Sequence, residues 1–361
     1  MNNLSIEDIV ELQSTGIQIG EPIEIQRGGA GPSDAVAIRV GSYTFMAPSI
    51  NRETAYALEP LEEGFSLRRN GEHICGAETV GVPRFYSGQT RDGIPFRKIA
   101  LLHGSDCLAS TVVQTCIRWN SAERCRFCGI GLSLATGNTI PVKRPEHLAE
   151  AAEAAVRLDG IKHIVLTTGT TNYRDKGTIY LAECSRAIAE AVEVPIQVQC
   201  EPPDDLGLLG LLRDSGVDSI GIHLESFDQN VREKVTPGKA SVSLDYYDRT
   251  FGQAVKVFGA NQVSTFVIAG LGEPADSIIE GCKRLIDAGV YPFVLPLRPI
   301  PGSDMESACA PSVKTMMHIY AGVSSALKAR GLSWQRSTAG CVRCGACSAL
   351  PAFERLSGVE Q

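Results

Sequence analysis

The alternation of short apolar runs with amphipathic stretches over about residues 100–331 constrains the fold of this chain more than any other feature. Apolar, β-branched runs predict strands at 108–115, 163–168, 195–200, 219–225, 263–270 and 292–297. Stretches with helical periodicity follow them, at 145–158, 179–192, 204–214, 228–234 with 244–258, 275–289 and 312–331. Repeated strand–helix units predict an α/β fold with a parallel sheet, because right-handed helical crossovers connect parallel neighbours.

The number and order of these units favour a partial (βα)6 barrel of the TIM type. Polar residues follow the apolar strands at their carboxyl ends, as is typical of barrels. A doubly wound open sheet is the alternative architecture. In both architectures the loops after the strands hold the functional site, so candidate residues are sought there.

Residues 1 to about 100 follow a different pattern from the rest of the chain. Short alternating segments such as AVAIRV and TFMAP lie between turns rich in Gly and Pro, which indicates a small, mostly β region. We therefore divide the chain into a β-rich N-terminal region (1–100), a core (101–331) and a cysteine-rich C-terminal tail (332–361).

Composition and charge exclude several classes of protein. The chain has 361 residues, of which 43% are hydrophobic and 21% charged, which is ordinary for a globular protein. Its net charge of −7 provides no basic field that would attract nucleic acid or anionic lipid. No apolar run approaches the roughly 20 residues that a membrane span needs, and the N-terminus lacks an apolar signal core. We expect a soluble, cytoplasmic protein without a membrane or nucleic-acid partner.

Twelve cysteines are present, and half of them fall into two tight groups. The groups are Cys116/Cys125/Cys128 and Cys341/Cys344/Cys347, and the scattered cysteines are Cys75, Cys107, Cys184, Cys200, Cys282 and Cys309. In the cytosol, clustered cysteines more often serve metal binding or catalysis than disulfide formation. Both groups are therefore candidate metal sites.

The first group lies on the loop expected after the first core strand. Three thiolates would leave one corner of a cubane [4Fe–4S] cluster free for a small molecule. Cys107 is the nearest candidate for a fourth ligand, but the intervening strand should carry it to the opposite end of the sheet. CxxC pairs such as Cys125/Cys128 are also common zinc ligands, so zinc is the alternative.

The segment CIRWNSAERCRFC resembles the cysteine motif of the radical S-adenosylmethionine (radical SAM) superfamily. Most members of that superfamily have CxxxCxxC with an aromatic residue just before the last cysteine. This chain keeps Cys125, Cys128 and the aromatic Phe127, but eight residues separate Cys116 from Cys125. The resemblance implies a [4Fe–4S] cluster on Cys116, Cys125 and Cys128, with S-adenosylmethionine as the second cofactor.

Later strand ends resemble the cofactor-binding elements of the same superfamily, in the same order, over roughly residues 105–310. The turn at 167–170 stands where members have a GGE-like turn for the methionyl amine, although the glutamate is missing, and 223–226 stands where ribose contacts occur. Arg232, or else Lys234, would meet the methionyl carboxylate, and VIAGLGE (267–273) resembles the segment beside the adenine. The resemblance therefore implies cofactor contacts from Phe127, Thr168, Gly169, Thr170, Glu225, Ser226, Arg232, Gly270 and Leu271.

Ordinary structural roles are open for several of these residues. Glu225 could be a solvated carboxylate at the end of a strand, and Arg232 could lie on a solvent-facing helix surface. Gly270 could simply allow a turn. No residue of the chain is singled out as catalytic.

The tail segment CVRCGAC places two CxxC steps within seven residues, from Cys341 to Cys347. The glycine between them favours a tight loop around a metal. The resemblance implies a second, auxiliary [4Fe–4S] cluster; zinc and a metal-free thiol group are the alternatives. Cys309, Cys107, Cys75 and bound substrate are all candidates for its fourth ligand.

The resemblance implies an enzyme that cleaves S-adenosylmethionine reductively to a 5′-deoxyadenosyl radical. That radical would abstract hydrogen from a small-molecule biosynthetic substrate, with a flavodoxin- or ferredoxin-type reductant as partner. The overall pattern resembles a bacterial group found beside nitrilase-type genes. Two other functions are considered: a sulfur-inserting synthase resembling lipoyl and biotin synthases, and a non-catalytic iron–sulfur or zinc protein.

Overall fold

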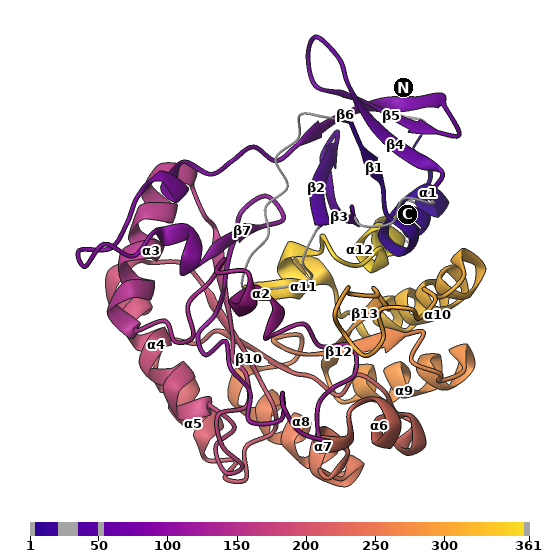
Figure 1. The fold of residues 1–361 in the computed structure, drawn as a ribbon. Coiled ribbons are helices and arrows are strands. Elements are labelled where there is room, and N and C mark those ends of the chain that lie inside the picture. The colour runs from indigo at the N-terminus through magenta and orange to yellow at the C-terminus, as the bar shows by residue number, and fades with distance from the viewer. Residues whose placement is uncertain (1–3, 21–34, 50–53, 357–361) are drawn as a thin grey trace.

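The computed structural model describes residues 4–20, 35–49 and 54–356, which form two β-sheets and the helices around them. The smaller sheet lies beside the larger one, near the C-terminal helices (Figure 1). It has six strands in the order β1-β4-β5-β6-β2-β3. Together with one helix it forms what we call the N-terminal module. Its elements are α1 (Ile6–Thr15), β1 (Gln18–Ile19), β2 (Ala35–Val40), β3 (Tyr43–Pro48), β4 (Tyr56–Pro60), β5 (Phe65–Arg69) and β6 (Glu72–Thr79).

The larger sheet has seven strands in strictly sequential order, from β7 at one edge to β13 at the other. These are β7 (Leu101–His103), β8 (Cys107–Thr111), β9 (His163–Thr167), β10 (Ile196–Cys200), β11 (Ser219–Ile222), β12 (Val263–Ala269) and β13 (Val290–Pro296). Strands β8 to β13 are parallel, and β7 is an antiparallel edge strand on β8. Within the described ranges no pairing joins β13 to β7, so the barrel is open.

The helices surround the larger sheet on its outside (Figure 1). The longer ones are α3 (Pro145–Asp159), α4 (Thr178–Ala191), α5 (Leu208–Asp214), α6 (Gln229–Val235), α8 (Leu244–Phe258), α9 (Ala275–Asp287), α10 (Val313–Arg330) and α12 (Leu350–Leu356). Short turns of helix are η1 (Arg84–Ser87), η2 (Phe96–Lys98), α2 (Leu132–Ala135), α7 (Pro237–Ala240), η3 (Trp334–Arg336) and α11 (Gly340–Cys344). The expected partial (βα)6 barrel with a β-rich N-terminal region is confirmed, and the sequential strand order excludes a doubly wound sheet.

Helix ends follow from local sequence. Pro145 occupies the first turn of α3, where its missing N–H leaves no hydrogen bond unmade, and Gly160 ends the helix at a φ of 66°. Ser243 caps α8 by accepting a hydrogen bond from the backbone N–H of Tyr246.

The first parallel strand is shorter than expected. We predicted a strand over 108–115, but β8 ends at Thr111. Beyond it, Val113 forms only an isolated bridge to Val142, and the Gln114 N–H donates to the carbonyl of Pro141 at 2.8 Å. The cysteine loop therefore begins after an irregular segment and not directly at the end of a strand. The edge strand β7 was not predicted.

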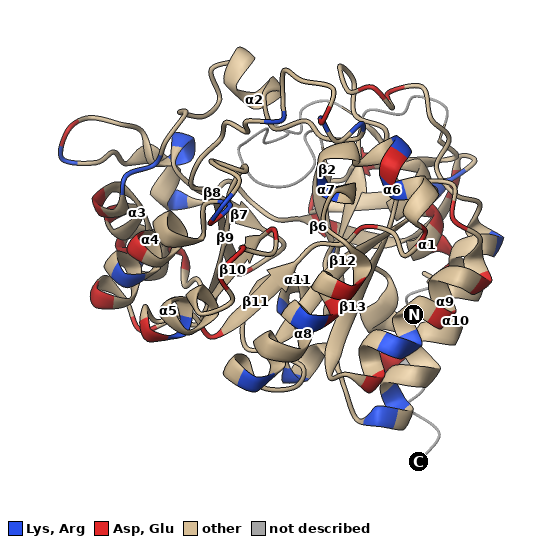
Figure 2. Ribbon diagram, turned by 90° about the horizontal axis from the view of Figure 1, so that it is seen from below, with Lys and Arg blue, Asp and Glu red and all other residues tan. Residues whose placement is uncertain are grey.

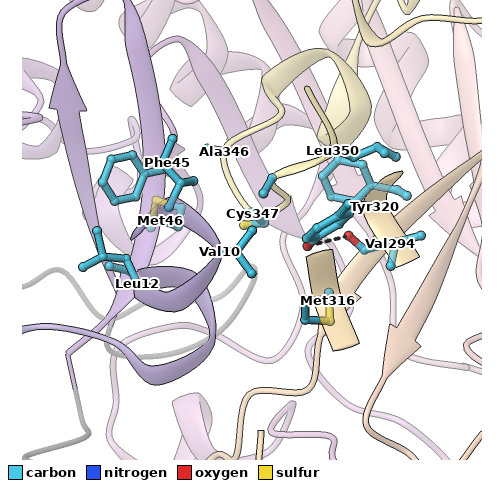
Figure 3. Packing of buried hydrophobic residues seen from close by; sticks show 14 of the residues in the cluster. Val10, Leu12, Phe45, Met46, Val294, Met316, Tyr320, Ala346, Cys347 and Leu350 are labelled. Atoms are coloured by element: carbon cyan, nitrogen blue, oxygen red, sulfur yellow. Dashed lines mark hydrogen bonds between the residues drawn. The ribbon is translucent and has the colours of Figure 1, made fainter. Parts of the chain in front are cut away.

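Two large hydrophobic clusters stabilise the structure. One lies between the larger sheet and helices α3, α4, α5 and α8. The other joins the N-terminal module to β12, β13, α9, α10 and the cysteine-rich tail. In Figure 3 the side chains of α1 and β3 lie on one side of Cys347, and those of β13, α10 and α12 lie on the other. The N-terminal module is therefore packed against the tail.

Acidic and basic residues are interspersed along the outer helices α3, α4 and α5 (Figure 2). In the part of the chain that the structure describes, no helix has the length and apolar character needed to cross a membrane.

We expect Leu12→Ala to destabilise the chain strongly. Leu12 is fully buried where α1 meets β3 and the tail, so truncation removes apolar contacts and leaves a cavity. The expected loss in the free energy of unfolding is about 2–5 kcal/mol. Urea unfolding followed by circular dichroism measures it. Leu61→Ala is the matched control because Leu61 is 53% exposed, and it should change stability by less than about 0.5 kcal/mol. Equal effects would contradict the packing described.

Candidate active site

The three cysteines of the first group meet at the carboxyl ends of the parallel strands. Cys116, Cys125 and Cys128 line one pocket of about 160 Å³, which we call the carboxyl-end pocket. The end of β9, residues 167–170, and the end of β10, residues 199–201, line the same pocket. The sequence-based expectation that these segments come together is therefore met by the geometry.

Backbone contacts to two distant segments hold the cysteine loop over the sheet. The N–H of Ile117 donates to the carbonyl of Thr170 at 2.9 Å, and the N–H of Arg126 donates to the carbonyl of Val235 at 2.8 Å. The loop is therefore anchored to the turn after β9 at its start and to α6 near its end.

Burial makes two thiols of this loop, those of Cys125 and Cys128, poor acids. It raises the pKa of Cys125 to about 12, although the nearby Lys239 ammonium opposes the shift. Burial raises the pKa of Cys128 as well. A cation bound between the thiols would favour the thiolate forms and reverse these shifts.

Gly169 is required by a close approach of two backbones. A Cβ at this position would lie 2.1 Å from the carbonyl oxygen of Thr115, well inside contact distance. The Gly169 N–H also donates to the carbonyl of Val113 at 2.9 Å. The absence of a side chain thus lets the turn after β9 pass directly beneath the start of the cysteine loop.

Two buried ion pairs border the carboxyl-end pocket. The Lys239 ammonium lies 2.7 Å from Glu225, and the Arg118 guanidinium lies 3.0 Å from Glu201. Side-chain exposure is at most 15% for all four groups. Thr170 also donates its hydroxyl hydrogen to Glu201. The pocket therefore offers fixed charges of both signs.

Glu225 and Arg232 both lie inside the protein. Glu225 is buried in a left-handed conformation with φ of 67°, and burial raises its pKa despite Lys239. Arg232 is 1% exposed and donates to the carbonyls of Lys239 and Val242 at 3.0 and 2.8 Å. The solvent-exposed roles considered for both residues are therefore wrong. Arg232 positions the segment that carries Lys239.

The remaining predicted cofactor contacts divide into two sets. Phe127, Thr168, Gly169 and Thr170 line the carboxyl-end pocket. Ser226 instead donates to Glu273 at 2.6 Å, and Leu271 belongs to an apolar cluster with Val231, Val235 and Leu297, against which Phe127 packs. Gly270 has φ of 101°, which explains the glycine. Their roles as cofactor contacts stay predictions.

Several residues of this pocket were not singled out from the sequence. They include Arg118, Gln199, Glu201 and Lys239. Glu201 could have been found, since it directly follows a predicted strand. Lys239 could not, because it lies on the four-residue helix α7, which has no recognisable period. His223, which was noted as isolated, also lines the pocket. Its Nδ1 accepts from the Phe266 N–H at 3.1 Å, and burial holds its pKa well below the usual range.

A second, larger cavity of about 350 Å³ lies inside the barrel; we call it the central cavity. Its lining is mainly apolar, with Phe266, Phe293 and Leu295 among the contributors. Part of its wall is shared with the carboxyl-end pocket: Phe127, Cys128, Ile130, Thr167, Thr168 and Gln199. The two cavities are therefore neighbours.

The far end of the central cavity is formed by the tail and by His103 of β7. His103, Cys341 and Cys347 belong to its lining. The Cys347 thiol lies 3.5 Å from His103 Nε2. Burial opposes ionisation of Cys347, but His103 and Arg298 outweigh it and lower the pKa of Cys347 to about 7. The two cysteine groups thus lie at opposite ends of one cavity.

Cys107 adjoins the tail cysteines and not the first group. It begins β8, at the amino end of the sheet, as expected from the intervening strand. Burial and the neighbouring Cys344, Cys341 and Cys347 thiols raise the pKa of Cys107. Over the described residues, no three His, Cys, Asp or Glu side chains converge closely enough to hold a single metal ion.

Comparison with known proteins identifies the class. A model of the radical SAM superfamily matches residues 122–291. The chain is 26% identical to the bacteriochlorophyllide c C-7(1)-hydroxylase of Chlorobaculum limnaeum over 65% of its own length and 63% of that protein. It is also 26% identical to the biotin synthase of Persephonella marina, over 51% of the chain and 53% of that protein. The chain thus spans between about half and two thirds of these relatives.

The solved structure of HydG, a maturase of the [FeFe]-hydrogenase, has the same fold. It matches with a TM-score of 0.50 and 17% identity, over 63% of this chain and 50% of HydG. The match at residues 122–291 and these relatives support a radical SAM domain in this chain. A domain of this family implies a [4Fe–4S] cluster and S-adenosylmethionine.

We expect Gly169→Ala to lower the melting temperature markedly. The added Cβ would collide with the backbone of Thr115, and no flexible side chain can move aside. Gly210→Ala is the control, because nothing lies within 4 Å of a Cβ there and Gly210 is inside helix α5. The control should be neutral or stabilising by about 0.5–1 kcal/mol. Similar melting temperatures for both variants would show that the approach at Gly169 is not tight.

We expect Lys239→Met to destabilise the cluster-free chain by about 3–5 kcal/mol near pH 8, because Glu225 keeps a buried charge without a partner. Loss of Lys239 raises the pKa of Glu225 further above its unfolded value. A raised carboxyl pKa costs nothing below the unfolded pKa of about 4.3, and its cost grows as the pH rises toward the folded pKa.

The stability loss of this variant should therefore be smaller near pH 5 than near pH 8. Urea unfolding at the two pH values measures the difference. Lys234→Met, which changes an exposed lysine on α6, is the control and should have little effect at either pH. A loss that does not depend on pH would contradict the role assigned to Glu225.

Proposed function

We propose that Cys116, Cys125 and Cys128 hold the [4Fe–4S] cluster of a radical SAM enzyme that abstracts hydrogen from a small molecule in the central cavity. One observation carries this proposal: the pocket lined by the three cysteines shares a wall with the central cavity. A reactive species formed in the pocket would meet the substrate without crossing solvent.

The residues present fit such a cluster. Three thiols on one anchored loop supply the soft sulfur ligands that iron–sulfur clusters use. Among the described residues that line the pocket, Cys200 of β10 is the one further cysteine. Cys200 is 6% exposed and ends its strand. When bound, the cluster and S-adenosylmethionine supply one-electron cleavage and hydrogen-atom abstraction.

The two ion pairs suit the methionyl end of S-adenosylmethionine. This end is a zwitterion, with an ammonium and a carboxylate on one carbon. Glu201 can accept hydrogen bonds from the ammonium, and Lys239 can donate to the carboxylate. Because these groups are already buried and paired, binding costs little reorganisation. We assign Lys239 this role in place of Arg232, whose guanidinium is bound to backbone carbonyls.

Of the other predicted contacts, five keep their roles in this proposal and three take a supporting one. The backbone at Thr168, Gly169 and Thr170 would meet the methionyl amine, and Phe127 would border the cluster. Leu271 lies in the apolar cluster against which Phe127 packs, which suits a neighbour of the adenine. Glu225, Ser226 and Gly270 would support these contacts from behind.

The central cavity defines the kind of substrate. Its volume of about 350 Å³ falls in the range of small-molecule sites, and its aromatic and aliphatic walls suit a largely apolar substrate. The walls also exclude water, which would otherwise quench or divert a radical. Gln199, Thr111 and Arg298 are among the polar lining groups that could orient the substrate.

We also propose that Cys341, Cys344 and Cys347 bind a second iron–sulfur cluster. The similarity to biotin synthase and the position of Cys341 and Cys347 on the cavity wall support it. The same position favours sulfur insertion as a second candidate function, because cluster sulfide would face the substrate. Loss of acid-labile sulfide with each turnover would support that alternative, and a constant sulfide content would reject it.

Radical SAM enzymes need a reductant, and we propose a flavodoxin- or ferredoxin-type protein for this chain. A cytoplasmic location and the association with nitrilase-type genes stay predictions.

The triple variant Cys116→Ala/Cys125→Ala/Cys128→Ala tests the assignment of the first cluster. The anaerobically purified protein should fall from about eight irons per chain to about four, since each cubane holds four irons. Reduced protein incubated with S-adenosylmethionine should no longer release 5′-deoxyadenosine and methionine, which chromatography measures. Cys309→Ala, at an exposed cysteine outside both cavities, is the control. Continued release by the triple variant would show that the assignment is wrong.

A further inference from the structure

We propose that Cys107 completes the tail site, so that Cys107, Cys341, Cys344 and Cys347 together provide four thiolates for one iron–sulfur cluster. This inference rests on the second cluster proposed above and adds the ligand that the tail motif lacks. Cys107 precedes the tail by more than 200 residues, so only the fold can bring it there.

The first argument is the place of Cys107 in the sheet. It is fully buried at the amino end of β8, and it packs with Ala109 and Val165. Cys341 and Cys344 pack against this same small cluster. Cys75 and Cys282 share only the large hydrophobic cluster that joins the N-terminal module to the tail.

The second argument is that the sheet holds the tail loop, residues 340–348, against these strands. The Gly340 N–H donates to His163 Nδ1 at 3.1 Å, and the Cys341 N–H donates to Gln197 Oε1 at 3.2 Å. Gln199 Nε2 lies 3.1 Å from the Cys341 sulfur. These partners come from β9, which pairs directly with β8, and from β10, the next strand of the sheet. The tail thiols are therefore placed relative to Cys107 by rigid elements.

The turn between β7 and β8 is adapted to the tail. Gly104 has φ of 62°, and a Cβ there would lie 2.6 Å from the Cys344 sulfur. The turn can therefore hold no side chain at this point, which brings the backbone beside the thiol. The carbonyl of His103 is 3.9 Å from the same sulfur. Both ends of the short β7–β8 hairpin thus contribute to the tail site.

The other candidates for the fourth ligand fit less well. Cys75 lies on β6, where it pairs with Leu67 across the N-terminal sheet, and Asp8 is its charged neighbour. Cys309 is exposed in the segment after β13. His103 Nε2 is 3.5 Å from Cys347, as suits a hydrogen bond to sulfur. Four thiols without the histidine already satisfy a cubane.

Full thiolate ligation has a consequence for the central cavity. Cys341 and Cys347 belong to the cavity lining, whereas Cys107 and Cys344 lie behind it. A cluster held by all four would form the floor of the cavity with no iron left open to substrate. The cluster would then stabilise the tail loop that closes the cavity or exchange electrons. It would not bind substrate through an open iron.

The test is made in the triple variant that lacks Cys116, Cys125 and Cys128, so that iron reports on the tail alone. This background should keep about four irons per chain. Adding Cys107→Ser or Cys107→Ala should lower the iron content or convert the cluster to a three-iron form, detected by electron paramagnetic resonance. Cys184→Ser is the matched control, since Cys184 is equally buried but lies on α4, and it should change neither readout.

A Mössbauer spectrum of the background variant tests the ligand set without a change at Cys107. Four all-sulfur iron sites are expected, and one distinct site with a nitrogen or oxygen ligand would overturn the proposal. An unchanged cluster after Cys107→Ala would overturn it too, as would loss of the cluster in His103→Asn but not in the Cys107 variants. Absence of iron in the triple variant itself would show that the tail binds no cluster. Release of 5′-deoxyadenosine by the wild-type protein tests the first cluster separately.

Discussion

The docking of the tail loop across the amino end of the parallel sheet is the interaction on which the rest of this structure depends. The carbonyl of Ala346 accepts hydrogen bonds from the Met46 N–H at 2.7 Å and from the Gln13 side chain at 3.0 Å, both in the N-terminal module. Arg298, after β13, donates to the Cys347 carbonyl at 3.1 Å. Because three regions of the chain meet at this loop, the N-terminal module is packed against the tail, and the tail closes the amino end of the open barrel.

The parallel sheet separates two cysteine sites that the sequence presents in similar form. One group lies at the carboxyl ends of the strands beside the ion pairs of Lys239 and Glu201, and the other lies at the amino ends beside β8. The central cavity connects them. Loops at the carboxyl ends are free to vary in a barrel, whereas the amino ends usually serve stability. In this chain the tail brings further chemistry to the amino end as well.

Much of the fold could be predicted because the core consists of regular strand–helix units. Long periodic helices such as α3 and α10 began and ended within a residue or two of the expected positions. The boundary of β8 was wrong: Val112, Val113 and Thr115 are β-branched and suggested a longer strand, but β8 ends at Thr111 and the chain continues to the cysteine loop. Lys239 and Arg118 were missed, because a charged residue in a short irregular segment has no pattern that reveals burial. Glu225 and Arg232 were found, but only the structure shows that they are buried.

The sequence by itself determined the class of architecture, the two cysteine groups and the order of the segments that line the carboxyl-end pocket. Hydrophobic periodicity and cysteine spacing are local properties of the sequence, so they can be recognised without knowledge of tertiary contacts. Only the tertiary structure showed that the Lys239 ammonium borders the carboxyl-end pocket, that Cys107 adjoins the tail cysteines and that one cavity connects both cysteine sites. These features depend on how close segments such as those of Cys107 and Cys344 lie in space, although more than 200 residues separate them in the sequence. Tertiary packing determines that proximity.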